Sequence, residues 1–162
     1  MTISVGDRLP EATLFEMTDQ GPAQVASADV FAGRTVALFG LPGAFTPTCS
    51  NSHMPGFVAA AAELRAKGVD AIVCVTVNDP YVAAEWGRVT GAEAAGIRVL
   101  GDSLAELTRG MGLDFDGSAR GLGVRCKRFS ALIRDGEVAI LNLEPAPGAA
   151  TCTAGEALLE QI

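Results

Sequence analysis

Residues 35–50, TVALFGLPGAFTPTCS, lead from an apolar run through a sharp break into the start of a helix. The run 35–40 predicts a buried core strand, because it is short, continuous and rich in apolar side chains. Pro42 and Gly43 end that strand, and Pro47 suits the first position of a helix. A strand that passes directly into a helix is the building unit of α/β proteins, so this stretch indicates the fold class.

Cys49 falls in the first turn of the predicted helix, with Thr46 as a candidate N-cap. Free backbone N–H groups and the positive end of the helix dipole favour an anion there, and therefore a thiolate over a thiol. Free cysteines are more often small apolar core groups. Cys49, however, has hydroxyl and amide side chains on both sides, at Thr48 and in residues 50–52. We therefore predict that Cys49 is a reactive nucleophile.

Cys74 contrasts with Cys49, because it lies within the apolar, β-branched run 71–77. Such a run predicts a strand buried on both faces and an inert thiol. The chain has four cysteines and no secretion signal, which suggests redox or catalytic use rather than a disulfide framework. No two cysteines have C-x-x-C spacing and His53 is the only histidine, so we expect no metal site.

Composition limits the partners and the location. With 162 residues, 49% of them apolar, and no linker, the chain predicts one domain over residues 1–162. The formal charge of −7 and the scattered Lys and Arg residues argue against a nucleic-acid partner. No segment approaches a membrane span, and the first residues lack a basic stretch followed by an apolar one. We therefore expect a cytoplasmic protein with no membrane partner.

Periodicity and turn signals predict an α/β fold, with a central mixed sheet flanked by helices and an N-terminal β-hairpin. The Asp-Gly pair in the second half of the chain is its strongest hairpin signal. The expected elements are a hairpin turning at Gln20 and Gly21, a helix from Cys49 to Gly68 kinked at Pro55, a strand at 71–77, a helix after Asn78-Asp79-Pro80, a strand at 97–100, a helix with a capping box of Ser103 and Glu106, strands at 129–134 and 137–143 around Asp135-Gly136, and a helix at 154–162.

The segment FGLPGAFTPTCS at residues 39–50 closely resembles the active-site motif of peroxiredoxins of the type-5, or type-II, group. The similarity covers nearly the whole chain. It continues through residues 53–57, 77–79, 85–87, 127–130 and 143–145. The resemblance implies a thioredoxin-like fold with peroxiredoxin insertions, and a peroxidase that needs no cofactor.

The resemblance also assigns roles to five residues. It implies that Cys49 is the peroxidatic cysteine, which attacks a hydroperoxide and becomes a sulfenic acid. Pro42 matches the proline that shields the thiolate, Thr46 the threonine that bonds to thiolate and peroxide, and Arg128 the arginine that stabilises the charge. Gly43 joins Thr46, Cys49 and Arg128 in the expected substrate-binding set. From the residues alone, Pro42 could be a turn residue, Thr46 an N-cap and Arg128 a solvated strand-end charge.

Two further thiols are candidates to resolve the sulfenic acid. Cys152 resembles the resolving cysteine of atypical two-cysteine enzymes by its distance from the C-terminus. That implies an internal disulfide with Cys49 and thioredoxin as the reductant. The alternative is a one-cysteine cycle recycled by glutaredoxin or glutathione. Cys126 ranks below Cys152, and a homodimer is expected by resemblance.

His53 follows Cys49 by four residues and so shares its helix face. It could act as a base, but we prefer a hydrogen-bonding role, because a helix terminus and an arginine can activate the thiolate without an imidazole. Two other functions stay open. One is a cysteine hydrolase that uses Cys49 with His53, and the other is a redox sensor that uses the same Cys49 chemistry without sustained turnover.

Overall fold

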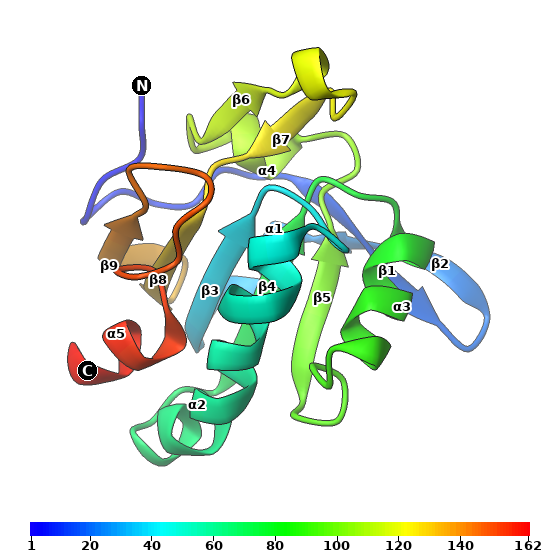
Figure 1. Ribbon diagram of the computed structural model, residues 1–162. Coiled ribbons are helices and arrows are strands. Elements are labelled where there is room, and N and C mark those ends of the chain that lie inside the picture. The colour runs from blue at the N-terminus through cyan, green and yellow to red at the C-terminus, as the bar shows by residue number, and fades with distance from the viewer.

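A computed structural model of residues 1–162 contains a seven-stranded mixed sheet with the strand order β2-β1-β5-β4-β3-β8-β9 (Figure 1). Its centre is made of β3 (Thr35–Leu41), β4 (Ala71–Thr76) and β5 (Ile97–Gly101), which run parallel to one another. These are the three predicted apolar runs, and their side chains are largely buried because helices cover both faces. The predicted mixed α/β sheet is confirmed.

Two antiparallel hairpins extend this sheet at its edges. β1 (Thr13–Thr18) and β2 (Gly21–Ala26) form the expected N-terminal hairpin, and β1 pairs with β5. β8 (Phe129–Arg134) and β9 (Glu137–Leu143) form the second hairpin, and β8 pairs with β3. Asp135 and Gly136 both have positive φ angles, of 48° and 77°, as the two central residues of a tight hairpin turn require.

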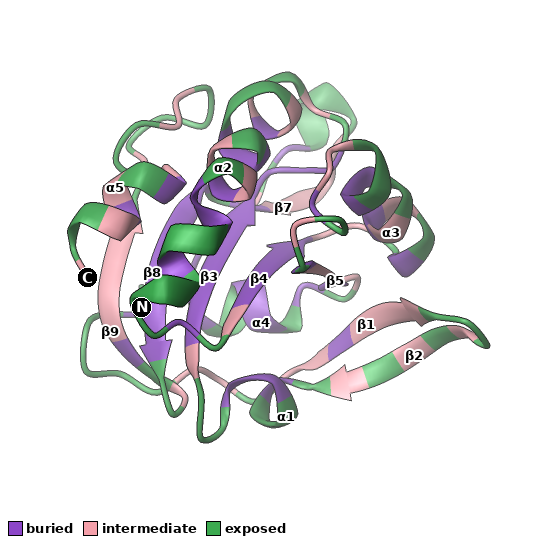
Figure 2. Cartoon of the chain, turned by 90° about the horizontal axis from the view of Figure 1, so that it is seen from below, coloured by how far each residue is buried: buried purple, intermediate pink, exposed green.

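Helices cover the two faces of the sheet. α2 (Met54–Ala66), α3 (Pro80–Val89) and α5 (Gly155–Glu160) contribute to one core cluster, whereas α1 (Ser27–Phe31) and α4 (Glu106–Gly110) contribute to the other. Figure 2 shows the buried central strands between α2 on one side and α1 and α4 on the other. None of these helices has both the length and the apolar character that crossing a bilayer requires.

A second, two-stranded sheet was not predicted from the sequence. It consists of β6 (Asp114–Asp116) and β7 (Val124–Cys126), joined through a 3-10 turn, η2 (Ser118–Arg120). Figure 1 shows it beyond the carboxyl end of β3, where the chain turns toward α2. Strands of three residues are too short to show a period in the sequence. This small sheet forms one wall of the site described below.

The predicted capping box before α4 is wrong. The Ser103 hydroxyl donates to the backbone oxygen of Asn78, and the Glu106 carboxylate accepts from the N–H of Thr13. The buried carboxylate of Asp102 instead accepts the N–H groups of Leu107 and Thr108, at 3.3 and 2.8 Å. A carboxylate five or six residues before the N–H groups that it bonds lies outside the usual capping spacing, so the pattern did not show it.

Candidate active site

Cys49 lies in the first turn of the helical segment that follows β3. Helical residues begin at Pro47, as predicted, and continue into a π-helical turn, η1 (Cys49–His53), before α2. In this turn the N–H of Met54 bonds to the carbonyl oxygen of Cys49, five residues earlier. Pro55 has no N–H to donate, which removes the next bond of a regular helix. The expected irregularity at Pro55 therefore takes the form of a π turn directly behind the thiol.

The turn before the helix is held by Thr46 and by a neighbouring strand end. Thr46 stands at the predicted N-cap position, because helical residues begin at Pro47 and its carbonyl accepts from the N–H of Ser50. Its hydroxyl, however, donates to the carbonyl of Gly43 at 2.6 Å, so the side chain closes the turn and does not cap a helix N–H. The N–H of Ala44 donates to Asn78 Oδ1, which follows β4. Phe45 has a φ of 62°, a left-handed conformation that costs energy for a residue with a Cβ atom. The turn is therefore fixed from several sides.

Arg125, a residue of β7 that the sequence did not single out, braces the same turn. Its Nη1 donates to the carbonyl of Pro42 at 3.1 Å, and its Nε donates to the carbonyl of Leu122 at 2.9 Å. A Cβ atom added at Gly43 would lie 2.3 Å from Arg125 Nη1. Glycine at position 43 therefore lets the guanidinium lie directly against its Cα. That close approach is a contact across the fold that no local pattern reveals.

Arg128 provides the cation beside the thiol. Its side chain is buried, and its Nη2 donates to Cys49 Sγ at 3.2 Å and to the carbonyl of Pro147 at 3.1 Å. Its Nε has no hydrogen-bond partner, and neither ion pair in the structure involves this arginine. A buried guanidinium without a carboxylate is costly unless another anion compensates its charge. Among the side chains that bond to this guanidinium, the thiol of Cys49 is the one that can become an anion.

His53 contacts Arg128 from the π turn. Its Nδ1 lies 3.0 Å from Arg128 Nη1 and its Nε2 lies 3.0 Å from the carbonyl oxygen of Thr153. Burial, followed by the charge of Arg128, lowers the pKa of His53 to about 3. The imidazole is therefore neutral near neutral pH, and its free lone pair already accepts from Arg128. That removes the base that a Cys49 and His53 hydrolase would need.

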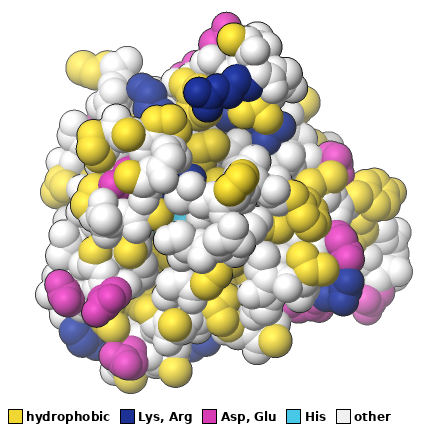
Figure 3. Space-filling model, in the orientation of Figure 1, with side chains coloured by type: hydrophobic (Ala, Val, Ile, Leu, Met, Phe, Trp, Pro, Cys, Tyr) yellow, Lys and Arg dark blue, Asp and Glu magenta, His cyan; other side chains and the backbone are white.

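A cavity of about 410 Å³ opens beside this cluster. Pro42, Thr46 and Arg128 all line it, so the structure brings these three predicted residues to one opening, with Cys49 fully buried beside them. Much of its lining is apolar, from prolines and from Phe115 on β6. On the face shown in Figure 3, charged side chains lie mainly toward the edges, with apolar ones between them.

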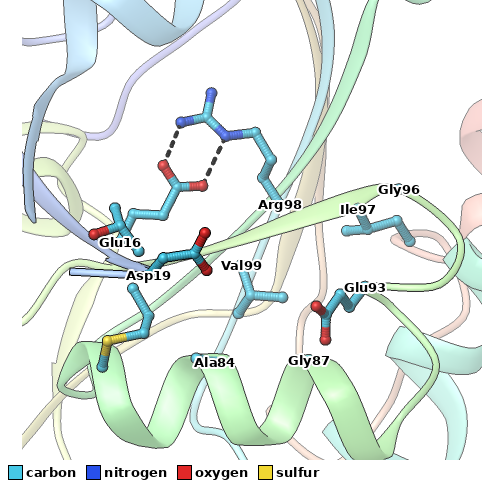
Figure 4. A pocket seen from close by; sticks show the side chains of 11 residues that line it. Glu16, Asp19, Ala84, Gly87, Glu93, Gly96, Ile97, Arg98 and Val99 are labelled. Carbon is cyan, nitrogen blue, oxygen red and sulfur yellow. Dashed lines mark hydrogen bonds and ion pairs between the residues drawn. The ribbon is translucent and has the colours of Figure 1, made fainter. Parts of the chain in front are cut away.

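A second groove, of about 440 Å³, lies on another part of the surface between β1, α3 and β5 (Figure 4). Its main polar feature is the ion pair between Arg98 and Glu16, at 2.8 Å. No cysteine or histidine lines it. The size of a cavity therefore does not identify the reactive site in this protein; the position of the thiol and the arginine does.

The other three cysteines have different surroundings, and all four are free thiols. Cys152 is exposed, and its Sγ lies 3.3 Å from the carbonyl of Leu143 and from Glu144 Oε2. Burial raises the pKa of Cys126 to about 12 and also raises that of Cys74 well above its ordinary value. Cys126 belongs to the core cluster on the opposite face of the sheet from Cys49, whereas Cys74 belongs to the same cluster as Cys49.

The loop that carries Cys152 nevertheless reaches the site through its backbone. The carbonyl of Pro147 accepts from Arg128, that of Gly148 accepts from the Thr48 hydroxyl, and that of Thr153 bonds to His53. The Cys152 thiol itself bonds to Leu143 and Glu144 instead. An attack of Cys152 on Cys49 therefore requires this loop to rearrange.

Comparison with known proteins places this site in a family. A model of the Redoxin family matches residues 4–158. The chain is 48% identical to Peroxiredoxin-2E-2, chloroplastic, of Oryza sativa subsp. japonica, over 99% of this chain and 73% of that protein. It is 45% identical to Peroxiredoxin-2B of Arabidopsis thaliana, over 88% of each protein. Reduced Prx3 of Vibrio vulnificus in complex with hydrogen peroxide has a TM-score of 0.92, 41% identity and 99% coverage of both chains.

These similarities, over a thioredoxin-like fold that buries a cysteine against an arginine, define the class of thiol-dependent peroxidases. Within it, the chain belongs to the peroxiredoxin family. The predicted fold, enzyme class and peroxidase function are confirmed. The expectation that the protein acts on a hydroperoxide with a thiol reductant is confirmed at the level of the family.

The expected cytoplasmic location is wrong in the light of the same comparison. Peroxiredoxin-2E-2 of rice is named chloroplastic, as is an Arabidopsis relative that is 41% identical over 99% of this chain. The sequence argument rested on charge and on the lack of an apolar span. Those properties fit several aqueous compartments equally, so they do not distinguish among them.

Proposed function

We propose that this protein is a peroxiredoxin of the type-5 group in which Cys49 is the peroxidatic cysteine. The observation that carries the proposal is the contact between Arg128 Nη2 and Cys49 Sγ, because the guanidinium is buried and has no carboxylate partner. A thiolate at Cys49 compensates that charge. The same cation then stabilises the negative charge that develops when a peroxide bond breaks.

In the proposed reaction, the Cys49 thiolate attacks the terminal oxygen of the hydroperoxide. A sulfur–oxygen bond forms, the oxygen–oxygen bond breaks, and the electron pair leaves on the alkoxide or hydroxide, which takes a proton from solvent. Cys49 is oxidised to a sulfenic acid and the peroxide is reduced to an alcohol or to water. Thr46 and the Arg128 guanidinium, which both line the cavity, align the peroxide, while Pro42 shields the thiolate and Gly43 contributes through its carbonyl, which holds the Thr46 hydroxyl.

The shape of the cavity supports both hydrogen peroxide and alkyl hydroperoxides as substrates. A volume of about 410 Å³ exceeds what hydrogen peroxide needs. Its apolar walls, which include Phe115 and Leu122, favour an alkyl group there. Competition between hydrogen peroxide and a tertiary alkyl hydroperoxide in single-turnover kinetics measures this preference. Equal exclusion of every alkyl peroxide would contradict the proposed substrate class.

For the second half of the cycle, we propose that Cys152 resolves the sulfenic acid. Its thiol attacks the Cys49 sulfur, water leaves, and an internal disulfide forms, which thioredoxin then reduces by thiol–disulfide exchange. The exposure of Cys152 and its place on the loop that contacts Arg128 and His53 support this role. Because the thiol bonds to Glu144 in the reduced protein, a one-cysteine cycle with glutaredoxin or glutathione is the alternative.

The deciding experiment combines mass spectrometry with turnover. The protein and its Cys152→Ser variant receive one equivalent of peroxide, and peptide mapping identifies the product at Cys49. An internal disulfide in the parent and a sulfenic acid in the variant support resolution by Cys152. The same sulfenic acid in both supports the one-cysteine cycle, and a disulfide to Cys126 would make the lower-ranked candidate the resolving thiol. Sustained peroxide turnover by Cys49→Ser would refute the proposed function itself.

We further propose that residues 1–162 act as one domain and associate as a homodimer near the active site. Three large apolar side chains, Phe45, Tyr81 and Leu104, are each more than half exposed. They extend from segments that Asn78 joins, since it accepts from both Ala44 and Ser103. Sedimentation of the parent and of a Leu104→Glu variant tests this interface, and a monomeric parent would contradict it.

A further inference from the structure

A continuous series of hydrogen bonds leads from the surface of the C-terminal loop to the Cys49 thiol. Glu144 Oε2 accepts from the N–H of Thr153 at 3.2 Å and from its hydroxyl at 2.9 Å. The carbonyl of Thr153 contacts His53 Nε2, His53 Nδ1 contacts Arg128 Nη1, and Arg128 Nη2 contacts Cys49 Sγ. We call these five residues the relay.

The groups on either side of His53 fix the direction of its two hydrogen bonds. A backbone carbonyl can only accept, so Nε2 of His53 must carry the proton that it donates to Thr153. A guanidinium can only donate, so Nδ1 of His53 must be the acceptor for Arg128. Both requirements are met by one neutral tautomer of the imidazole. His53 therefore holds Arg128 from one side while Cys49 lies on the other.

The outer end of the relay is anchored by Glu144. Burial alone would raise its pKa, but hydrogen bonds from Thr151, Thr153 and Cys152 outweigh that effect and lower the pKa of Glu144 to about 2. Its carboxylate is therefore ionised at neutral pH. It accepts hydrogen bonds from the N–H groups of Thr151 and Thr153, both at 3.2 Å, and so closes a turn over these residues. That turn fixes where the Thr153 carbonyl points.

Arg128 has few other contacts that could hold its guanidinium in place. No carboxylate pairs with it, its Nε has no partner, and its remaining acceptor is the carbonyl of Pro147. Pro147 and Thr153 belong to the same loop, between β9 and α5. The orientation of the arginine thus depends on the loop that Glu144 closes, and on His53 as the connection to it.

We propose that His53 and Glu144 are positioning residues for peroxide reduction, which hold Arg128 against the Cys49 thiolate through the Thr153 carbonyl. This inference rests on the proposed roles of Cys49 and Arg128. Neither positioning residue touches the peroxide or donates a proton in the reaction. The relay predicts that losing either residue lowers the thiolate population and the rate of peroxide attack together, because both depend on the same guanidinium.

The first test replaces His53 by Leu and by Gln. Leucine removes both hydrogen bonds, whereas a glutamine amide offers one donor and one acceptor and can restore both. For His53→Leu we expect the second-order rate constant with hydrogen peroxide to fall about tenfold to 100-fold, as for the loss of one or two hydrogen bonds to a charged group. His53→Gln should recover to within about threefold of the parent.

A second readout separates positioning from folding. The rate of Cys49 alkylation by iodoacetamide, followed by peptide mass spectrometry across a pH series, reports the thiolate population without any peroxide. His53→Leu should shift this profile toward higher pH, and His53→Gln should return it. A residue that serves only stability would change the thermal midpoint and leave the alkylation profile of the folded protein unmoved.

Glu144→Gln tests the outer end, with Glu160→Gln as its matched control. Glu160 is an exposed carboxylate at the end of α5 and belongs to no hydrogen bond of the site. For Glu144→Gln we expect a threefold to tenfold loss, in the range of about one neutral hydrogen bond, in both peroxide rate and alkylation near neutral pH. Glu160→Gln should match the parent in both.

Three outcomes would overturn the relay. They are folded His53 variants that keep both rates within about twofold of the parent, a His53→Gln variant as slow as His53→Leu, or a Glu144→Gln variant equal to its control. If neither His53 variant folds, the Glu144 pair decides. A parent that alkylates at Cys49 but fails to consume peroxide would instead refute the proposed function, while the alkylation series would still test the relay.

Discussion

Cys49 and Cys126 are both fully buried thiols, and yet their surroundings differ in charge. Cys49 has the guanidinium of Arg128 at 3.2 Å and lies beside a cavity. Cys126 donates to the carbonyl of Lys127 at 3.2 Å, and burial raises its pKa to about 12. Burial alone favours the neutral thiol in both places. The difference between the two sites is therefore the buried cation, on which the proposed nucleophilic role of Cys49 depends.

Replacing Arg128 by Met should have the largest effect, because it would leave Cys49 in surroundings like those of Cys126. Methionine keeps much of the volume and removes the charge. We expect the rate constant for peroxide to fall about 10²-fold to 10³-fold, as for removal of a group that stabilises charge in a transition state. Stopped-flow measurement with hydrogen peroxide gives this value directly.

Arg120→Met is the matched control, since Arg120 lines the same cavity but is exposed and bonds to neither Cys49 nor His53. It should change the rate by less than about threefold, the size of a screened surface effect. A folded Arg128→Met variant that loses less than its Arg120 control would show that the cation does not distinguish the two thiols.

Much of the structure around Cys49 could be predicted from the sequence. Residues 35–50 carry the strand, the turn and the helix start in one continuous pattern, so local physics places Cys49. Arg128 required the family resemblance, because its contact with Cys49 joins residues 79 apart in the chain. Arg125 and the small sheet of β6 and β7 could not be predicted, since three-residue strands have no readable period and the brace on Gly43 exists only in three dimensions.

Lowering the pH should reduce the free energy of unfolding through His53, which contacts Arg128 beside Cys49, and not through Cys126. The unfolded chain protonates His53 near its ordinary pKa of 6.5, but the folded protein resists protonation until about pH 3. The stabilising contribution is complete above the first value and is lost as the pH falls below it. Between pH 6.5 and about 5 the free energy of unfolding should fall by about 2 kcal/mol from this group.

Chemical denaturation of the parent, His53→Gln and Cys126→Ala at several pH values measures this loss. The His53→Gln variant should lack the slope in this window, and the Cys126→Ala variant should keep it. Glu144, whose pKa is lowered to about 2, acts only below its ordinary value of 4.5, so its loss appears at lower pH. An unchanged slope in His53→Gln would show that another group carries the acid sensitivity.

Gly43→Ala should have a smaller effect on Cys49, because it acts through the turn and not through the charge. The added methyl group would meet Arg125 Nη1 at 2.3 Å and displace either the guanidinium or the Pro42 turn. We expect about a tenfold loss in the peroxide rate constant, as for a modest misplacement of reacting groups. Gly148 lines the cavity beside Cys49 and has open space around its Cα, so Gly148→Ala should match the parent. Equal rates for the two variants would show that the packing of Arg125 against Gly43 does not affect the reaction.

Cys126→Ala should have the smallest effect on the chemistry. Its sulfur belongs to the core cluster that faces away from Cys49, so peroxide turnover should stay within about twofold of the parent. The free energy of unfolding should fall by about 1 kcal/mol, because one buried sulfur atom is lost. Cys126 should also resist alkylation in the folded protein at a pH where Cys49 reacts. A clear loss of turnover in Cys126→Ala, with Arg128 still in contact with Cys49, would mean that the two faces of the sheet are coupled. The difference in reactivity between Cys49 and Cys126 would then not depend on the cation alone.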